Sequence, residues 1–207
     1  KLISIFIVSY FSNFFSALSG GGAGLIQLPA LIFFGIPYHN ALAIHKIATV
    51  SLGIGSSIRN IRLFKNQFPQ FIQIILFGLP GVVTGSYIVK FLSDDLLYLI
   101  LGIFSVGIGL YSISKPEFGV ISEIKEIKLL ERIRFYLLIF LIGILNGSIS
   151  SGTGLMVTVL IIKTFGMDFI SAISLTFLSV GIVWNASGAI ALSQLGSPPM
   201  NVLILLI

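Results

Sequence analysis

Long apolar segments, interrupted by short glycine- and serine-rich stretches, dominate the chain. They cover residues 2–36, 40–58, 71–92, 96–114, 135–166 and 170–192, and each holds at most one Lys, Arg, Asp or Glu. An α-helix needs about 20 apolar residues to cross the hydrocarbon core of a bilayer. The pattern therefore predicts an all-α fold, namely a polytopic helical membrane protein.

Two of these segments are too long for one simple crossing. Residues 2–36 would extend over about 52 Å as a helix, and residues 135–166 are nearly as many. Each segment is broken near its centre, first at SGGGAG (Ser19–Gly24) and then at SISSGTG (148–154). Glycine disfavours helix by about 1 kcal/mol relative to alanine. Each segment is therefore either a broken crossing or a re-entrant hairpin, and the sequence leaves both open.

The two broken segments resemble each other, which predicts an internal repeat. Gly22 aligns with Gly152 and Gly24 with Gly154, and each break precedes a half-helix, a glycine, a turn and a further span. Matched breaks in repeated halves are typical of transporters. The chain divides into a first transmembrane repeat (1–114), a cytoplasmic amphipathic linker (115–134) and a second transmembrane repeat (135–207). The final NVLILLI resembles the first third of another span, so we expect the second repeat to be truncated.

The charged residues indicate what surrounds the chain and how it is oriented in the membrane. The chain is 56% hydrophobic and 9% charged, too few charges to cover a water-facing surface, so a lipid bilayer must surround it. The stretches after the second and fourth segments hold most basic residues: Arg59, Arg62, Lys65, Lys115, Lys125, Lys128, Arg132 and Arg134. The positive-inside rule places them in the cytoplasm. The net charge of +5 is therefore a topology signal, and no nucleic-acid partner is expected.

The two breaks predict an anion-binding site. A backbone break within lipid leaves amide groups unpaired unless protein or a polar cavity satisfies them. Helix N-termini carry partial positive charge, so two that face each other would bind an anion without arginine. The alternative is that the glycines serve only helix packing. The candidate residues are Ser19, Gly20, Gly21, Gly22 and Gly24 in the first break, and Ser150, Ser151, Gly152, Thr153 and Gly154 in the second.

Four further polar residues lie within the apolar segments: His45, Lys46, Thr176 and Asn185. Lys46 either pairs with a bound anion or extends to the membrane interface. His45 either exchanges a proton during transport or forms a structural hydrogen bond. Hydroxyl and amide groups such as those of Thr176 and Asn185 can donate to anion oxygens. These residues complete the predicted substrate site.

Motifs for other chemistry are missing from the sequence. It has no cysteine, no P-loop, no H-E-x-x-H and no G-x-S-x-G, so we expect no enzyme activity, metal or cofactor. GVVTG (Gly81–Gly85), together with Gly102, Gly107 and Gly109, indicates close helix packing rather than a site.

SGGGAGLIQLPALIFFGIPYHNALAIHKIA, followed by a basic turn, resembles the N-terminal half of the TauE/SafE-type sulfite exporter family of permeases. The matching positions are Gly20, Gly21, Gly22, Gly24, Pro29, Leu31, Gly35, Pro37, Ala41 and Lys46. SSGTGLMVTVLIIKTFGMDFISAISLT resembles the second half of the family's pattern. The resemblance implies export or uptake of sulfur-containing anions, such as sulfite or organosulfonates, across a prokaryotic plasma membrane.

The leading hypothesis is thus a secondary transporter for a small anion. Proton coupling through His45 and assembly as a homodimer stay open. A non-transporting assembly or receptor subunit, whose glycines serve only packing, is the alternative function.

Overall fold

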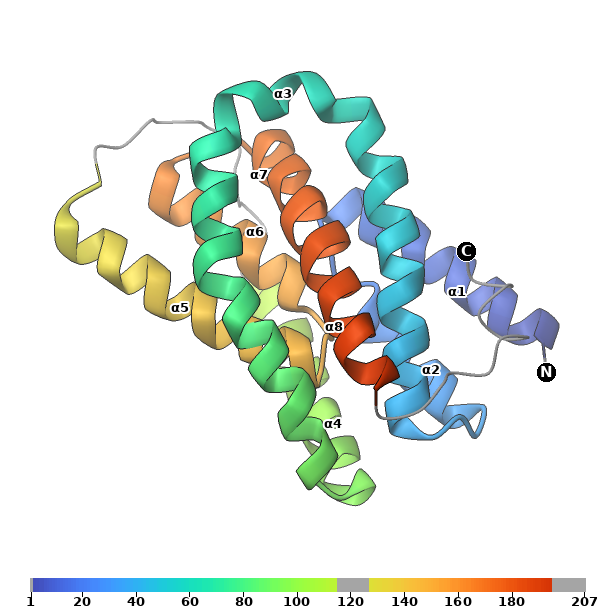
Figure 1. Cartoon of the computed structure of the whole chain (residues 1–207). Helices are drawn as coiled ribbons and strands as arrows, with labels where there is room; N and C mark the ends of the chain where they lie inside the picture. Colours follow the sequence, from blue (N-terminus) through green and yellow to red (C-terminus); the bar gives the residue numbers. More distant parts are fainter. Residues whose placement is uncertain (1, 115–126, 195–207) are drawn as a thin grey trace.

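The computed structural model describes residues 2–114 and 127–194, with backbone alone for 59–66 and 112. Helices make up the secondary structure of these ranges (Figure 1). They are α1 (Leu2–Ser19), α2 (Gly24–Phe33), α3 (Tyr38–Ile88), the 3-10 turn η1 (Val89–Phe91), α4 (Asp94–Ser114), α5 (Leu129–Ser148), α6 (Thr153–Phe165), α7 (Phe169–Thr176), the π-helix η2 (Phe177–Trp184) and α8 (Asn185–Ser193). Among the described residues, five stretches are long and apolar enough to cross a membrane, which confirms the polytopic helical class.

Helix α3 contains the basic stretch that the sequence pattern places in a loop. It continues from Tyr38 to Ile88, and Figure 1 shows it as an arch whose two limbs are joined by a helical crossover. The limbs hold the second and third apolar segments, and the basic turn expected between them is helical. RNIRLFKNQ lacks glycine and proline and is rich in residues of good helix propensity. The chain can therefore reverse here without losing the helix.

The stretch α7–η2–α8 runs between the two limbs of α3, and α5 lies beside the second limb (Figure 1). Glycines bring α3 and α5 close together. A Cβ atom on Gly81 or Gly85 would collide with the backbone of Phe140 or Ile144. This confirms close packing as the role of GVVTG. In contrast, Gly102, Gly107 and Gly109 have no described heavy atom within 4 Å of a Cβ position, so the same interpretation of these three glycines is wrong for the described part.

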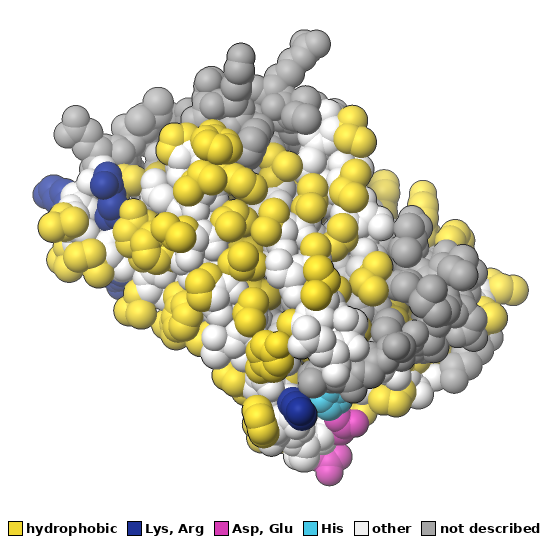
Figure 2. Space-filling view, viewed as in Figure 1, with side chains coloured by type: hydrophobic (Ala, Val, Ile, Leu, Met, Phe, Trp, Pro, Cys, Tyr) yellow, Lys and Arg dark blue, Asp and Glu magenta, His cyan; other side chains and the backbone are white. Residues whose placement is uncertain are grey.

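On the face that Figure 2 shows, many hydrophobic side chains are exposed, and the charged side chains in view lie near its ends. Helix α1 shows why: it buries Ile5, Ser9, Ser12 and Ser16 along one face and leaves its phenylalanines exposed. Small serines permit close approach to the bundle, while the aromatic side chains can contact lipid tails. The inward face of α1 is thus its polar face, as is typical of a helix beside a polar interior in a bilayer.

Two buried apolar clusters hold the bundle together. One includes Leu28, Leu31 and Leu42 from α2 and the first limb of α3. The other joins the second limb of α3, α5 and α6 through side chains such as Ile74 and Ile139. The predicted linker at 115–134 lies mainly outside the described residues, and its last six residues belong to α5. The final segment, 201–207, also lies outside them. The internal repeat and the three-part division stay predictions.

Candidate functional site

The two predicted breaks contact each other in the interior. The first separates α1 from α2, and the second separates α5 from α6. A Cβ atom on Gly21 would lie 2.9 Å from the carbonyl carbon of Gly154, and one on Gly24 would lie 2.9 Å from Cα of Ser151. The backbones of the two breaks are therefore packed directly against one another.

The first break is made by backbone conformations that favour glycine. Gly20, Gly21 and Gly22 have φ angles of 79°, 129° and 97°, a region that side chains disfavour. The N–H groups of Gly20 and Gly21 both donate to the carbonyl of Ser16, at 3.1 and 3.0 Å. These hydrogen bonds end α1, and the following glycine allows the chain to turn into α2.

The second break uses side-chain hydrogen bonds. Ser150 and Gly152 have positive φ angles of 60° and 69°. Thr153 Oγ1 donates to the Ser150 carbonyl at 2.8 Å, and Asn146 Nδ2 donates to Thr153 Oγ1 at 2.9 Å. The end of α5 is thus tied to the start of α6 across the turn.

A small cavity of about 30 Å³ lies between the breaks, with room for about two water molecules. Its walls come from both breaks and from α1, α3, α5, η2 and α8. They are formed by Ser16, Gly21, Gly22, Ala23, Gly24, His45, Thr49, Asn146, Ser150, Thr153, Gly154, Thr176, Phe177, Val180, Gly181 and Asn185.

Four backbone N–H groups at this cavity lack an acceptor within the described ranges. They belong to Gly22, Ala23 and Gly24 at the start of α2 and to Gly154 at the start of α6. The first amides of a helix have no intrahelical partner, and they carry the positive end of the helix dipole. The cavity wall therefore offers hydrogen-bond donors from two helix N-termini.

Lys46 is fully buried behind this wall. Its Nζ donates to the carbonyl of Asn146 at 2.7 Å, to Oδ1 of Asn146 at 3.1 Å and to Oδ1 of Asn185 at 3.4 Å. The side chain does not extend to the membrane interface, and no carboxylate within the described residues pairs with it. Its charge is thus stabilised by neutral oxygens alone in this part of the chain.

His45 lines the cavity next to the first break. Its Nδ1 lies 2.6 Å from Oε1 of Gln27. Because an amide oxygen only accepts, Nδ1 carries the proton, and Nε2 of the neutral ring is an acceptor. A Cβ atom on Gly24 would lie 3.0 Å from Nε2, so this nitrogen lies against the start of α2.

Nine of the predicted site residues line the cavity: Gly21, Gly22, Gly24, His45, Ser150, Thr153, Gly154, Thr176 and Asn185. Five do not: Ser19, Gly20, Lys46, Ser151 and Gly152. Ser19 is exposed and donates to the Gly21 carbonyl at 2.8 Å. The Gly20 carbonyl accepts from Thr158 Oγ1 at 2.9 Å.

The hydroxyls of Ser151 and Ser105 are 3.2 Å apart, and Gly152 packs against Ile108. Sequence reasoning missed seven lining residues: Ser16, Ala23, Thr49, Asn146, Phe177, Val180 and Gly181. Asn146 had a usable signal, because it is an amide within an apolar segment and two residues before the serine- and glycine-rich break that begins at Ser148. The apolar lining residues had none, since they resemble ordinary core positions.

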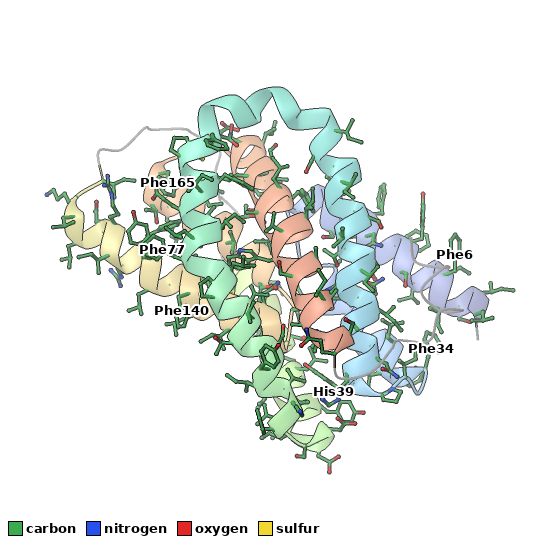
Figure 3. The ribbon with its side chains drawn as sticks, in the orientation of Figure 1. Phe6, Phe34, His39, Phe77, Phe140 and Phe165 are labelled. Atoms are coloured by element: carbon green, nitrogen blue, oxygen red, sulfur yellow. The ribbon has the colours of Figure 1, made fainter. Side chains whose placement is uncertain are left out.

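A second polar group lies at the end of the bundle where α3 begins. His39 (labelled in Figure 3) has Nδ1 at 3.5 Å from the carboxylate of Asp94 at the start of α4. Both side chains are partly exposed, and neither lines the cavity. This pair connects α3 to α4 and is separate from the central site.

Interrupted helices that meet around an interior cavity, lined by both polar and apolar residues, define the class: a polytopic membrane protein built as secondary transporters are. The chain belongs to the TauE/SafE sulfite exporter family, whose family model matches residues 5–207. The residues that carry the resemblance in the sequence are therefore those of a true member.

Curated relatives carry transporter names. The probable membrane transporter protein YfcA of Escherichia coli (strain K12) is 31% identical over 115 residues, which is 56% of this chain and 42% of the relative. The probable membrane transporter protein ORF9 of a Sinorhizobium species is 25% identical over 153 residues, covering 74% and 58%. A probable membrane transporter protein of Haemophilus influenzae is 24% identical over 167 residues, covering 81% and 64%.

The matched part thus spans between 42% and 64% of the length of these relatives. No solved structure matches the chain. The family and the bacterial relatives support a multi-pass bacterial membrane protein.

Proposed function

We propose that the chain forms the substrate-binding part of a secondary transporter for small anions in a bacterial plasma membrane. Sulfur oxyanions, such as sulfite or organosulfonates, are the proposed substrates. The observation that carries the proposal is the cavity between the two breaks, where four backbone N–H groups have no described acceptor. The family name supports the sulfur chemistry.

Electrostatics favour an anion over a neutral or cationic solute. Lys46 lies behind the cavity wall with no carboxylate partner in the described part of the chain. A charge inside a membrane protein is costly unless it is paired or strongly hydrogen-bonded. A bound anion would provide the missing negative charge and accept hydrogen bonds from the α2 and α6 amides.

Entry of an anion requires the cavity to widen. Its volume of about 30 Å³ accommodates about two water molecules, less than a sulfite ion with its four heavy atoms needs. Residues of η2 line one wall, and a Cβ atom on Gly53 of α3 would lie 2.9 Å from the carbonyl carbon of Gly181 in η2. A π-helix is often found at functional sites. Movement of η2 along α3 is therefore the proposed gating step.

His45 is the proposed coupling residue. It lines the cavity beside the free amides of α2 and presents an unprotonated Nε2 in the neutral ring. Protonation of the ring together with anion binding would couple the movement of a proton to the movement of the anion. This role applies only if the chain transports an anion, and the proposed anion site does not depend on it.

A flux assay tests the proposal. The full-length protein in proteoliposomes is expected to move labelled sulfite and methanesulfonate, with acetate as the non-sulfur anion for comparison. Gly154→Val should reduce this flux at least tenfold, because its added methyl groups extend into the cavity. Gly55→Val is the matched control, since a Cβ on Gly55 meets no described heavy atom within 4 Å.

Flux of sulfur anions that Gly154→Val removes and Gly55→Val retains would support the proposal. No flux of any anion, with the protein folded and inserted, would instead favour a non-transporting subunit. Equal flux in both variants would remove the cavity from the transport pathway.

A further inference from the structure

The ammonium group of Lys46 has no N–H group left for a substrate. A lysine side chain donates three hydrogen bonds and accepts none. The three acceptors around Nζ are the carbonyl of Asn146 and the Oδ1 atoms of Asn146 and Asn185. Lys46 also does not line the cavity. Its contribution to substrate binding must therefore pass through the two asparagines.

Lys46 determines which way these amides face. An asparagine amide has one acceptor atom and one donor atom, and either can face a polar cavity. Since a lysine only donates, the atom that faces Nζ must be Oδ1 in both asparagines. The acceptor atoms of Asn146 and Asn185 are thus held on the lysine side.

The Nδ2 donors of the two asparagines differ in the acceptors that are available to them. Asn146 Nδ2 donates to Thr153 Oγ1 at 2.9 Å and lies 3.5 Å from Asn185 Oδ1. Asn185 Nδ2 donates to no acceptor within the described ranges, although Asn185 lines the cavity. Asn185 therefore offers a free N–H donor on the same cavity that the helix N-termini line.

We propose that Lys46 is a positioning residue that fixes the amide of Asn185 with its donor available to the substrate, so that this wall selects anions whose oxygens carry no proton. The proposal rests on the proposed function and makes it more specific. The favoured class is the fully ionised sulfonate or sulfite type. An anion of the same shape that carries an O–H group would meet N–H groups on this wall, and its own donor would find no acceptor there.

Methanesulfonate and the methylphosphonate monoanion are the matched probes. Both are tetrahedral monoanions, but the phosphonate retains one O–H group below its second ionisation, so the comparison is made at about pH 5. The full-length protein in detergent micelles should bind methanesulfonate more tightly by about tenfold or more, because an unpaired buried donor costs that much or more.

Removing Lys46 should change selectivity as well as affinity. In Lys46→Met and in the more conservative Lys46→Gln, the Asn185 amide can rotate and accept from the phosphonate O–H. The ratio of the two affinities should then fall about tenfold towards one. Lys90→Met, which removes an exposed positive charge outside the cavity, should leave the ratio unchanged.

A double variant isolates Asn185 from the other cavity groups. With Asn185→Leu in place there is no amide to rotate, so adding Lys46→Met should leave the ratio unchanged. His45 and the cavity hydroxyls are common to all variants and cancel in this comparison. Thermal unfolding of each variant establishes that it is folded before binding is measured.

The possible outcomes distinguish a failure of the inference about Lys46 from a failure of the proposed function. A ratio that falls in the Lys46 single variants, but not when Asn185→Leu is already present, supports positioning. If both affinities fall together at a constant ratio, Lys46 acts through its charge or its packing, and the inference is overturned while the anion site stands. A wild-type protein that binds neither anion overturns the inference and the proposed function together.

Discussion

Both breaks end one helix and begin the next, but they differ in the residues that form the turn. The first uses three consecutive glycines at positive φ, Gly20 to Gly22, and its turn is closed by backbone hydrogen bonds to Ser16. The second uses a serine and one glycine at positive φ; backbone hydrogen bonds from Ile149 and Ser150 to the Leu145 carbonyl close it as well, and the Thr153 and Asn146 side chains add to them. Both end one helix and begin another at the shared cavity.

The two breaks share few identical residues, and their turns use different backbone conformations and side chains. Backbone freedom can be supplied by glycine alone, whereas a side-chain network can help to hold a turn that has only one glycine at positive φ. Residues of both breaks line one cavity, while the internal repeat stays a prediction, and the residues that stabilise the two breaks are not interchangeable. The comparison predicts that the first break is sensitive to any added side chain and the second to loss of particular hydrogen bonds.

The largest effect should come from Gly21→Ala. The new Cβ would lie 2.9 Å from the backbone of both Gly154 and Leu155, at a φ of 129°. Backbone strain and overpacking together should lower the free energy of unfolding by about 2–5 kcal/mol. Chemical denaturation in mixed micelles measures this loss.

Gly154→Ala is the control from the second break, because its Cβ would approach no atom closer than 3.4 Å. It should change the free energy of unfolding by less than about 1 kcal/mol. Equal losses in the two variants would contradict the asymmetry between the breaks.

Asn146→Leu should have the next largest effect. It removes an acceptor from the buried Lys46 ammonium and the donor to Thr153, which should cost about 2–4 kcal/mol in the same denaturation experiment. Ser179→Ala is the matched control, since this buried hydroxyl donates only within its own helix, to the Leu175 carbonyl. A loss no larger than that of Ser179→Ala would show that the second break does not depend on its side chains.

Thr158→Val should have a smaller effect at the first break. Thr158 Oγ1 donates to the Gly20 carbonyl at 2.9 Å and lies 2.8 Å from Thr176 Oγ1. Since one hydroxyl has one hydrogen, Thr176 must donate to Thr158 in this arrangement. The expected loss is about 1–2 kcal/mol. Thr84→Val, at an exposed hydroxyl that donates to Pro80 of its own helix, should show almost none.

Ser19→Ala should have the smallest effect. Its exposed hydroxyl donates to the Gly21 carbonyl and does not line the cavity. The free energy of unfolding should change by less than about 0.5 kcal/mol, with anion flux in proteoliposomes unchanged. A large loss of flux would show that Ser19 contacts the substrate in a wider state of the cavity.

Much of the fold follows from the sequence because lipid imposes simple rules. Apolar length predicts the spans, and glycine and serine clusters within them predict the breaks. The continuous α3 was not predicted, because a basic stretch between two apolar segments usually indicates a loop. Its residues also form helix readily, and packing of both limbs decides between these outcomes.

The sequence predicts where the candidate site lies better than it predicts the contacts between its residues. Gly22 and Gly154 line the cavity as the break pattern predicts. The relation between Lys46 and Asn146 joins residues 100 apart in sequence, and no local pattern reveals such a pair. The structure places Lys46 behind the cavity wall, where it donates to the two asparagines instead of lining the cavity.

The most direct test of the account is a density map of the full-length protein with an organosulfonate bound. The account predicts the sulfonate between the two breaks, with its oxygens about 2.7–3.2 Å from the backbone nitrogens of Gly22–Gly24 and Gly154. An anion bound elsewhere in the bundle, or helices that continue without interruption through Gly22 and Gly152, would contradict it.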